Sequence, residues 1–378
     1  MVRLGEEAFG ALRRAYLRAM REPLVTVGTD LVLLELRGRP VLGGVGREVA
    51  APGPLPEPAG WATDPELHEA AWSVYRDMVR AEDSPWPIDG HRRPVWSAEL
   101  VEAVAVARAV AAEHGVDHAN ERHLVLGLLT DTGSRACRLL ASAGVDRAGL
   151  LARIRDDSRG TRAGEPRREV HDRFRAAGLL LSTHPRWWNG VQPAVTRTVA
   201  RQAGLSAVLY SLEGEMLRQA GRTDSAVVMT DHAILAILAL DEQLAEVGTG
   251  FGERVWSLNR AGEVLEPAGV TLDAATPVAG RGTTGQLTVP DAESSRLRES
   301  WRPGDPPWGR AVVRAMERAQ EDAERRGHRA AGTTHLLLAL VTPEVGTAAE
   351  LLRNLGVDLS AVAAHAERLL GEVPAGRR

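Results

Sequence analysis

The chain has 378 residues, which is long enough for two ordinary domains with sizeable cores. Its 46 basic and 50 acidic residues give a net charge of −4, and every basic residue is an arginine. The charge argues against bulk nucleic-acid binding. The missing lysine excludes a standard Walker-type ATPase site, a pyridoxal Schiff base and Ser-Lys hydrolase chemistry.

Cysteine content and apolar runs give an expectation for the compartment. The single cysteine, Cys137, permits no internal disulfide and fits a reducing cytosol. No segment approaches 18 consecutive apolar residues, and residues 1–14 contain two glutamates where a signal peptide needs an apolar run. We therefore expect a cytoplasmic protein without a membrane span. The alanine-rich, aromatic-poor composition and the 3.6-residue periodicity predict an all-α fold.

The first predicted helical unit covers residues 5–36. Alanines recur at every fourth position from Ala11 to Ala19, which places small side chains on one face of a helix. Small residues at this spacing let another helix approach closely. A Gly-Thr-Asp sequence ending at Asp30 marks the start of that second helix. Residues 61–95 follow as a predicted helical insertion.

The second unit, 96–151, aligns with the fourth, 308–363, at an offset of 212 residues without a gap. Alanines spaced by four residues are followed in both by a run of leucines and then by a Gly-Val-Asp turn. The repeat therefore predicts the same small helical unit twice. Shared residues include Trp96/Trp308, Ala107/Ala319, Gly115/Gly327, His123/His335 and Gly144/Gly356.

The third unit is a weaker copy. Residues 205–239 supply a first helix and the start of a second, an interruption is expected at 241–258, and the pattern resumes at 261–272. The Arg- and Gly-rich stretch 156–168 is the best linker between the two pairs of units. A polar, Gly- and Pro-rich loop insertion is predicted at 277–307.

The fourth unit has the clearest helix boundaries. A helix over 310–326 should end at Gly327 in a left-handed conformation, which glycine adopts without a steric penalty. Three more helices should follow it. Their expected first residues or caps are Thr333 or Thr334, then Ala348, and then Asp358 or Ser360.

These units resemble the repeat of the Clp N-terminal domain, which precedes the motor of Clp-type AAA+ unfoldases. The resemblance is best over 310–370, from Glu-Arg-Arg-Gly-His through Gly-Thr-Thr-His-Leu-Leu-Leu to Leu-Gly-Val-Asp. It implies two tandem Clp-N-like domains, each a pseudo-symmetric pair of four-helix repeats. The implied boundaries are domain 1 at 1–155, with repeats at about 5–58 and 96–155; a linker at 156–190; and domain 2 at 191–378, with repeats at about 191–276 and 308–372.

The resemblance implies a binding protein and not an enzyme. Domains of this family dock adaptors and substrates, in Gram-positive members also phosphoarginine marks, and in actinobacteria they are the target of cyclic peptide antibiotics. The expected partners are therefore peptides, cyclic peptide natural products, Clp adaptors, Clp substrates or the Clp ATPase, with no nucleic acid, membrane, cofactor or metal. A scaffold that binds its partners through the insertions is the alternative. Codon bias and escape from lysine-directed degradation tags both remain open as reasons for the missing lysine.

Two sets of site residues follow from the resemblance. The family's phosphoarginine site uses the glutamate of Gly-Thr-Glu-His, and a carboxylate at that position is kept only at Asp30 and Asp231. Arg122 and Thr334 replace it in the other two units, and a simple helix cap is the alternative role for the aspartates. The candidate peptide-binding residues are Trp96, Trp308, Trp187 and Trp188, with a place in the core between repeats as the alternative for the first two.

Two further motifs resemble sites of known chemistry. The sequence Gly-x-Gly-x-x-Gly at 280–285 is followed by Gln-Leu-Thr-Val-Pro, where a dinucleotide-binding fold needs a helix. His114, His118 and His123 lie close in sequence, but Gly115 interrupts a helix that would join them, so a structural role for the histidines is favoured over a zinc site.

Overall fold

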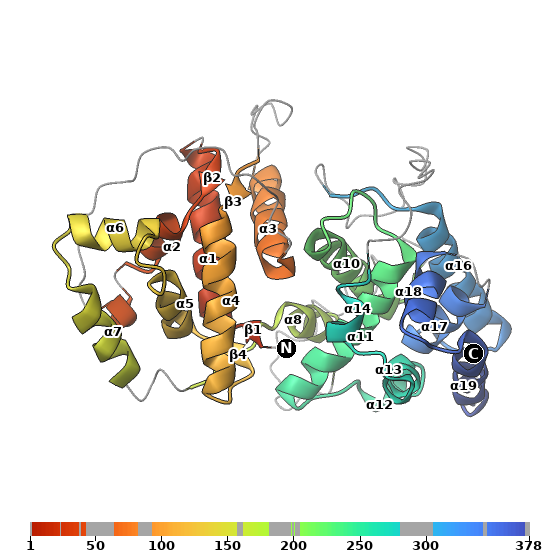
Figure 1. Cartoon of the computed structure of the whole chain (residues 1–378). Helices are drawn as coiled ribbons and strands as arrows, with labels where there is room; N and C mark the ends of the chain where they lie inside the picture. Colours follow the sequence, from red (N-terminus) through yellow and green to blue (C-terminus); the bar gives the residue numbers. More distant parts are fainter. Residues whose placement is uncertain are drawn as a thin grey trace. The chain divides into compact units, whose positions relative to one another are not determined.

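The computed structural model describes residues 2–22, 24–37, 39–42, 64–81, 93–156, 162–180, 198, 200, 205–279, 305–342 and 346–374. The described chain is mostly helical, as the sequence predicts, and divides into two compact units at the bond between Arg167 and Arg168 (Figure 1). Among the described residues, none of the helices is long and apolar enough to cross a membrane.

Unit 1 contains two helical repeats and an additional helix. The elements of the first repeat are β1 (Arg3–Leu4), α1 (Glu6–Arg21), β2 (Thr26–Val27), α2 (Thr29–Glu35) and the 3₁₀ helix η1 (Pro40–Leu42). The additional helix is α3 (Pro65–Ala81), which packs against α1. The elements of the second repeat are β3 (Val95–Trp96), α4 (Ala98–Glu113), β4 (His118–Ala119), α5 (Glu121–Leu128), α6 (Arg135–Ser142) and α7 (Arg147–Asp156).

Short strand pairs, which the sequence patterns do not predict, join the repeats of unit 1. β1 pairs with β4 and β2 pairs with β3, both in parallel. The strand before the first helix of each repeat therefore pairs with the strand before the second helix of the other repeat. The helices follow the same exchange, since α6 packs against α2 and η1 packs against α5. Each repeat thus completes the core of its neighbour.

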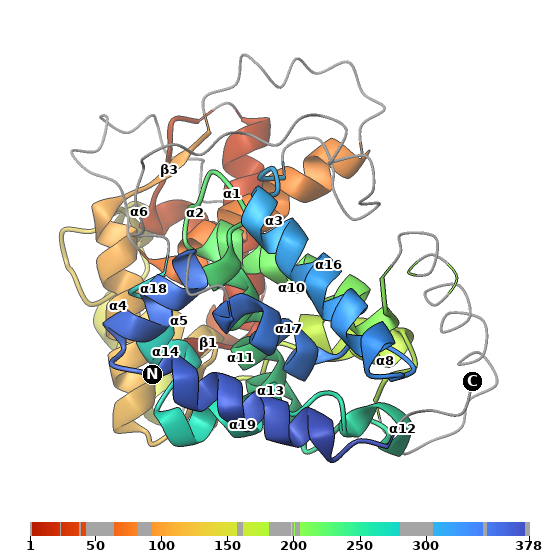
Figure 2. The ribbon, with the colours of Figure 1, turned by 90° about the vertical axis from the view of Figure 1, so that its right-hand side faces the viewer.

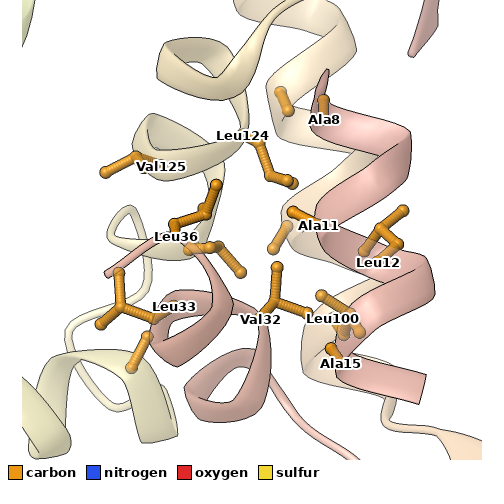
Figure 3. Close-up of a cluster of buried hydrophobic side chains, with 14 of the residues drawn as sticks. Ala8, Ala11, Leu12, Ala15, Val32, Leu33, Leu36, Leu100, Leu124 and Val125 are labelled. Atoms are coloured by element: carbon orange, nitrogen blue, oxygen red, sulfur yellow. The ribbon is translucent and has the colours of Figure 1, made fainter. Parts of the chain in front are cut away.

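The core of unit 1 lies between the first and second helices of the two repeats (Figure 3). Ala8, Ala11 and Ala15 of α1 face Val32 of α2 and Leu124 of α5 in this cluster, and all five are buried. The predicted alanine face is therefore a helix–helix contact. The equivalent close approach in the second repeat needs a glycine, because a Cβ on Gly127 of α5 would collide with the carbonyl oxygen of Ala103.

Unit 2 has two repeats of the same kind, preceded by α8 (Glu169–Ala176). The first repeat contains α10 (Ala207–Arg222), α11 (Thr230–Val247), α12 (Glu253–Trp256), α13 (Ala261–Leu265), η5 (Glu266–Ala268) and α14 (Leu272–Ala275). The second, shown in Figure 2, contains α16 (Arg310–Arg325), α17 (Thr333–Val341), α18 (Thr347–Asn354) and α19 (Leu359–Gly371). A parallel bridge between Val228 and Trp308 occupies the position of the β2–β3 pair.

Helix starts and ends in unit 2 follow from local chemistry. Gly327 follows α16 with φ +71°, and Asp358 caps α19 by accepting from the backbone N–H groups of Ser360 and Ala361, both as predicted. The predicted cap of α17 by Thr333 or Thr334 is wrong. Gly332 is the N-cap residue, and the threonines are the first two residues of the helix.

Two other boundaries differ from the sequence expectations. The interruption expected at 241–258 begins within α11, which continues to Val247 because Gln243 and Leu244 are buried and extend its packed face. The stretch 156–190 was expected to be a linker, but part of it is folded. Val170 and Phe174 of α8 are buried in unit 2, and Phe174 packs edge-to-face against Phe251 at a 6.0 Å centroid distance.

Candidate functional site

The second helix of each repeat begins at the position where the sequence has a candidate binding carboxylate in two repeats, Asp30 and Asp231. In α11 and α17, the first N–H groups are satisfied by residues of the other repeat of the same unit or by an aspartate within the first turn. In α17, for example, the Thr333 N–H donates to Oδ1 of Asn259 and the Thr334 N–H donates to the carbonyl oxygen of Leu258. In α5, Asn120 instead caps its own helix by accepting from Arg122 and His123. These helix starts therefore form the seam between repeats.

A histidine links the end of the first helix to the start of the second in three repeats. Nδ1 of His123, His232 and His335 accepts from the N-cap backbone N–H at 3.0, 2.8 and 3.2 Å. Because Nδ1 accepts, the proton resides on Nε2, which points to Nδ1 of His114, Oγ1 of Thr223 or Nδ1 of His328 at 2.9–3.0 Å. Burial lowers the pKa of His232, and lowers that of His335 to about 4. These histidines are therefore neutral structural links.

Asp30 lies at the seam of unit 1 and holds an arginine of the other repeat. Its carboxylate is 1% exposed, and its Oδ2 accepts from Nε of Arg135 at 2.7 Å. The neighbouring Thr29 accepts a hydrogen bond from the Ala136 backbone N–H at 3.1 Å. Asp30 therefore binds a guanidinium that belongs to the same chain.

Asp231 occupies the matching position of unit 2 and has a hydroxyl partner. Its Oδ1 accepts from Oγ1 of Thr347 at 3.0 Å. The Thr347 hydroxyl oxygen in turn accepts from the Asp231 backbone N–H. Thr230 accepts from the Ala348 N–H at 2.9 Å, as Thr29 does from Ala136. Thr347 is the residue that aligns with Arg135 at the offset of 212. The aspartate at this position therefore has an arginine partner in unit 1 and a threonine partner in unit 2.

The remaining two repeats have other contacts at the same place. Thr334 accepts from the Arg260 backbone N–H at 2.9 Å, and Arg260 is the residue that precedes α13. In unit 1, Glu121 pairs with Arg39 at 3.2 Å, next to η1. Burial raises the pKa of Glu121, and the guanidinium of Arg39 opposes that change. Each seam thus combines hydrogen bonds and ion pairs that run between repeats.

Two predicted peptide-binding tryptophans lie in the interior. Trp96 is 5% exposed, donates its indole N–H to the Leu67 carbonyl oxygen at 3.0 Å and packs against Tyr16. Trp308 is 1% exposed, and its backbone forms the parallel bridge to Val228. The structure thus places both in the core between repeats, the alternative that the sequence left open. Their role in peptide binding stays a prediction.

The other candidate residues from the sequence lie outside the described residues or have structural contacts. Trp187, Trp188 and the Gly-x-Gly-x-x-Gly sequence at 280–285 lie outside the described residues. His114 and His123 contact each other, while burial and the nearby Arg3 lower the pKa of His118. A search of the described residues finds no group of three or more His, Cys, Asp or Glu side chains arranged to hold a metal ion.

Sequence reasoning missed the partners of the carboxylates. The offset of 212 already aligns Arg135 with Thr347, but the alignment gives no contact between these residues and the aspartates. Arg167 was also missed, although it is 6% exposed and forms ion pairs with Glu66 and Glu69. A buried arginine inside an Arg-rich stretch has no pattern that distinguishes it from its solvated neighbours.

Comparison with known proteins places the best-defined repeat in a family. Residues 310–377 match the Clp repeat (R) N-terminal domain. An ATP-dependent Clp protease ATP-binding subunit, the ClpA homolog of Guillardia theta, is 32% identical over 155 residues, which are 38% of this chain and 17% of that protein.

Two further relatives have the same kind of name. The ClpA homolog of Porphyra purpurea is 41% identical over 66 residues, covering 18% of this chain and 8% of the relative. The chloroplastic chaperone ClpC of Pisum sativum is 30% identical over 155 residues, covering 38% and 15%. The aligned part of the chain thus spans less than a fifth of the length of these relatives. Residues 310–377 thus match the Clp repeat (R) N-terminal domain, and part of the chain is similar to the proteins named above.

Proposed function

We propose that the chain is a non-enzymatic peptide- or protein-binding protein that modulates or shields a Clp protease. In this proposal it binds degrons, Clp adaptors or Clp-targeting cyclic peptides through its repeats. The proposal is supported by the Clp repeat at 310–377 and by relatives that are named as ATP-binding subunits of Clp proteases. It is also supported by the complete absence of lysine, which a Walker-type motor would need.

Within this function, the difference between the two seams favours one carboxylate as the ligand site. Asp30 already pairs with the guanidinium of Arg135, so a ligand arginine would have to displace a buried ion pair. At the matching position of unit 2, Asp231 accepts from the hydroxyl of Thr347, and a hydroxyl is a weaker donor to a carboxylate than a guanidinium is. We therefore assign recognition of a phosphoarginine or arginine side chain to Asp231 and not to Asp30.

Calorimetry on the full chain tests both levels of the proposal. The titrants are phosphoarginine, a Clp-targeting cyclic peptide and a Clp adaptor. Binding of at least one supports the general function, and binding of none contradicts it. The Asp231→Asn variant should weaken phosphoarginine binding at least tenfold, whereas Asp30→Asn, the matched control in the other unit, should leave it unchanged. Equal loss in both variants, or loss only in Asp30→Asn, would contradict the assignment to Asp231.

A further inference from the structure

The segment 162–167, which we call the strap, is bound along the seam of unit 1 by backbone hydrogen bonds. The Gly164 N–H donates to the His118 carbonyl oxygen at 2.8 Å, and the Glu165 carbonyl oxygen accepts from the Glu6 N–H at 2.8 Å. The Arg162 carbonyl oxygen accepts from Nδ2 of Asn120 at 2.7 Å. Since Glu6 begins α1 and His118 belongs to β4, the strap contacts both repeats. The seam therefore holds the strap through its backbone, as peptide-binding sites hold extended segments.

The crossing point requires glycine in the strap. A Cβ on Gly164 would lie 3.1 Å from the carbonyl oxygen of Ala119 and 3.2 Å from Cα of Gly5. A Cβ on Gly5 would lie 2.9 Å from Cα of Gly164. The two backbones thus approach too closely for a side chain on either one. A larger residue at this point would force one of the two backbones to shift.

Three residues after Gly164, Arg167 enters a pocket built to hold a cation. Its guanidinium donates to Oε1 of Glu69 at 2.7 Å, lies 3.4 Å from Oε1 of Glu66 and stacks over the Phe9 ring at 4.1 Å. Glu66 and Glu69 are 3% and 2% exposed, so the two carboxylates are almost fully desolvated. Two buried carboxylates and an aromatic face favour an arginine over any neutral side chain.

The pocket is held in place by residues outside the strap. Glu66 accepts from the Leu4 backbone N–H at 3.1 Å and from Arg108 at 2.6 Å, and Arg108 also binds Asp64. Three acidic side chains thus surround the two arginines. Asp64 also accepts from the Glu66 and Leu67 N–H groups, so Glu66 is held by partners other than Arg167. A peptide arginine from elsewhere would meet the same preformed acidic pocket.

We propose that unit 1 contains a binding site for extended Gly-x-x-Arg peptides at the β1–β4 seam, and that Gly164 to Arg167 occupy it as a built-in ligand. The strap then competes with peptides of the same pattern presented by a partner protein. This site goes beyond the proposed function above, since it is distinct from Asp30 and Asp231 and uses the peptide backbone as well as an arginine. Its ligand is unphosphorylated, because the pocket is acidic.

The experiment measures peptide binding to the full chain when the strap is displaced. The Gly164→Val variant adds a side chain where Ala119 and Gly5 leave no room, and the exposed neighbour Arg168→Ala is the control. The probe is fluorescein-labelled Arg-Ala-Gly-Glu-Pro-Arg, followed by anisotropy. Gly164→Val should bind it at least ten times more tightly than the wild type and Arg168→Ala. Replacing the Gly of the peptide by Val, or its last Arg by Ala, should abolish that gain.

Folding of the variants is checked by circular dichroism and by hydrogen exchange at the Glu6 and Gly164 positions. If Gly164→Val does not fold, Arg167→Gln is the second strap variant and is judged by the same outcomes. A folded variant with no gain in peptide affinity would overturn the proposal. Unfolding of both variants would also overturn it, because a displaceable ligand is not needed for the fold.

Discussion

Arg135 and Asp30 are 105 positions apart in the chain, yet Nε of Arg135 donates to Oδ2 of Asp30 at 2.7 Å across the seam of unit 1. The equivalent pair in unit 2 is Thr347 and Asp231, joined at 3.0 Å by a hydroxyl. The first seam therefore contains a buried ion pair at this position, and the second contains a hydrogen bond from a hydroxyl. Removing one partner of a buried ion pair leaves an uncompensated charge, which costs more than loss of a neutral bond.

Arg135→Ala should therefore destabilise unit 1 by about 3–4 kcal/mol in denaturant unfolding, because it leaves the buried Asp30 carboxylate without its guanidinium. Arg135→Thr, which copies the residue of unit 2, should cost less because a hydroxyl can still donate. The double variant Asp30→Asn with Arg135→Thr should recover most of the loss. Equal destabilisation in all three variants would mean that the ion pair itself contributes little.

Gly127→Ala should disrupt the contact between α4 and α5. The added methyl group would collide with the Ala103 carbonyl oxygen and lie 3.1 Å from the Ala107 backbone nitrogen. We expect a loss of about 2–3 kcal/mol in the free energy of unfolding, as for other overpacked cores. Gly115→Ala is the control, because the space around Gly115 is open and its φ of +68° alone should cost about 1 kcal/mol. Similar losses in both variants would rule out close packing as the cause.

His335 should make unit 2 less stable in acid. Burial and the neighbouring His328 lower its pKa to about 4, so the unfolded chain takes up a proton near pH 6.5 while the folded chain does not. Stability is then fully present above pH 6.5 and is lost as the pH falls toward 4, by about 3 kcal/mol for this group. Urea unfolding at pH 7 and pH 4.5 measures the loss.

The His335→Gln variant should have a smaller difference between those two pH values, even though it is less stable at pH 7. His365→Gln, on α19, serves as the control and should keep the wild-type difference. A His335→Gln variant with the full wild-type pH dependence would show that another group is responsible.

Asp241 should have the opposite effect, with stability lost as the pH rises toward 7. Burial raises its pKa to about 7, and the nearby Glu263 and Glu266 add to that rise. The folded chain therefore binds a proton that the unfolded chain has released, and stability is lost as the pH rises through about 7. Asp241→Asn should be about 1–2 kcal/mol more stable than the wild type at pH 8.5, with a smaller gain at pH 5. Glu242→Gln is the adjacent control, and an equal gain in that variant would contradict the assignment.

Trp308→Ala should reduce the stability of unit 2, because the side chain belongs to the core. Its side chain is 1% exposed, and truncation of a buried aromatic costs about 3–5 kcal/mol. Thermal unfolding of the variant should show a lower Tm for unit 2, and Trp96→Ala should do the same for unit 1. A variant with wild-type stability and lost peptide binding would instead identify the ring as a ligand contact.

Periodic small residues and glycines allow much of the helical fold to be predicted. Ala315, Ala319 and Ala323 are buried on one face of α16, and Gly327 follows that helix in the left-handed conformation. Helix starts are harder to predict from sequence. The N–H groups at Thr333 and Thr334 are satisfied from the other repeat, so neither threonine needs to act as a cap. The two-residue strands cannot be predicted from sequence either, because two residues such as Thr26 and Val27 are too few to show an alternation of apolar and polar side chains.

The candidate sites are predictable only in part. Sequence places Asp30 and Asp231 at helix starts, where the structure also has them. It does not reveal that Arg135 holds one carboxylate and Thr347 the other, because these contacts join residues more than 100 positions apart. The strap could not be predicted for a different reason. Its residues 162–165 are bound through backbone groups, which every residue type has, and only Gly164 reflects the contact in its identity.

A calorimetric titration of the full chain with a Clp-targeting cyclic peptide, phosphoarginine and a Clp adaptor tests the central claim most directly. We predict saturable binding of at least one of them at a stoichiometry of one or two per chain, with phosphoarginine binding lost in Asp231→Asn and kept in Asp30→Asn. No heat of binding for all three, with the fold verified by circular dichroism, would contradict the assignment of this chain as a binding protein.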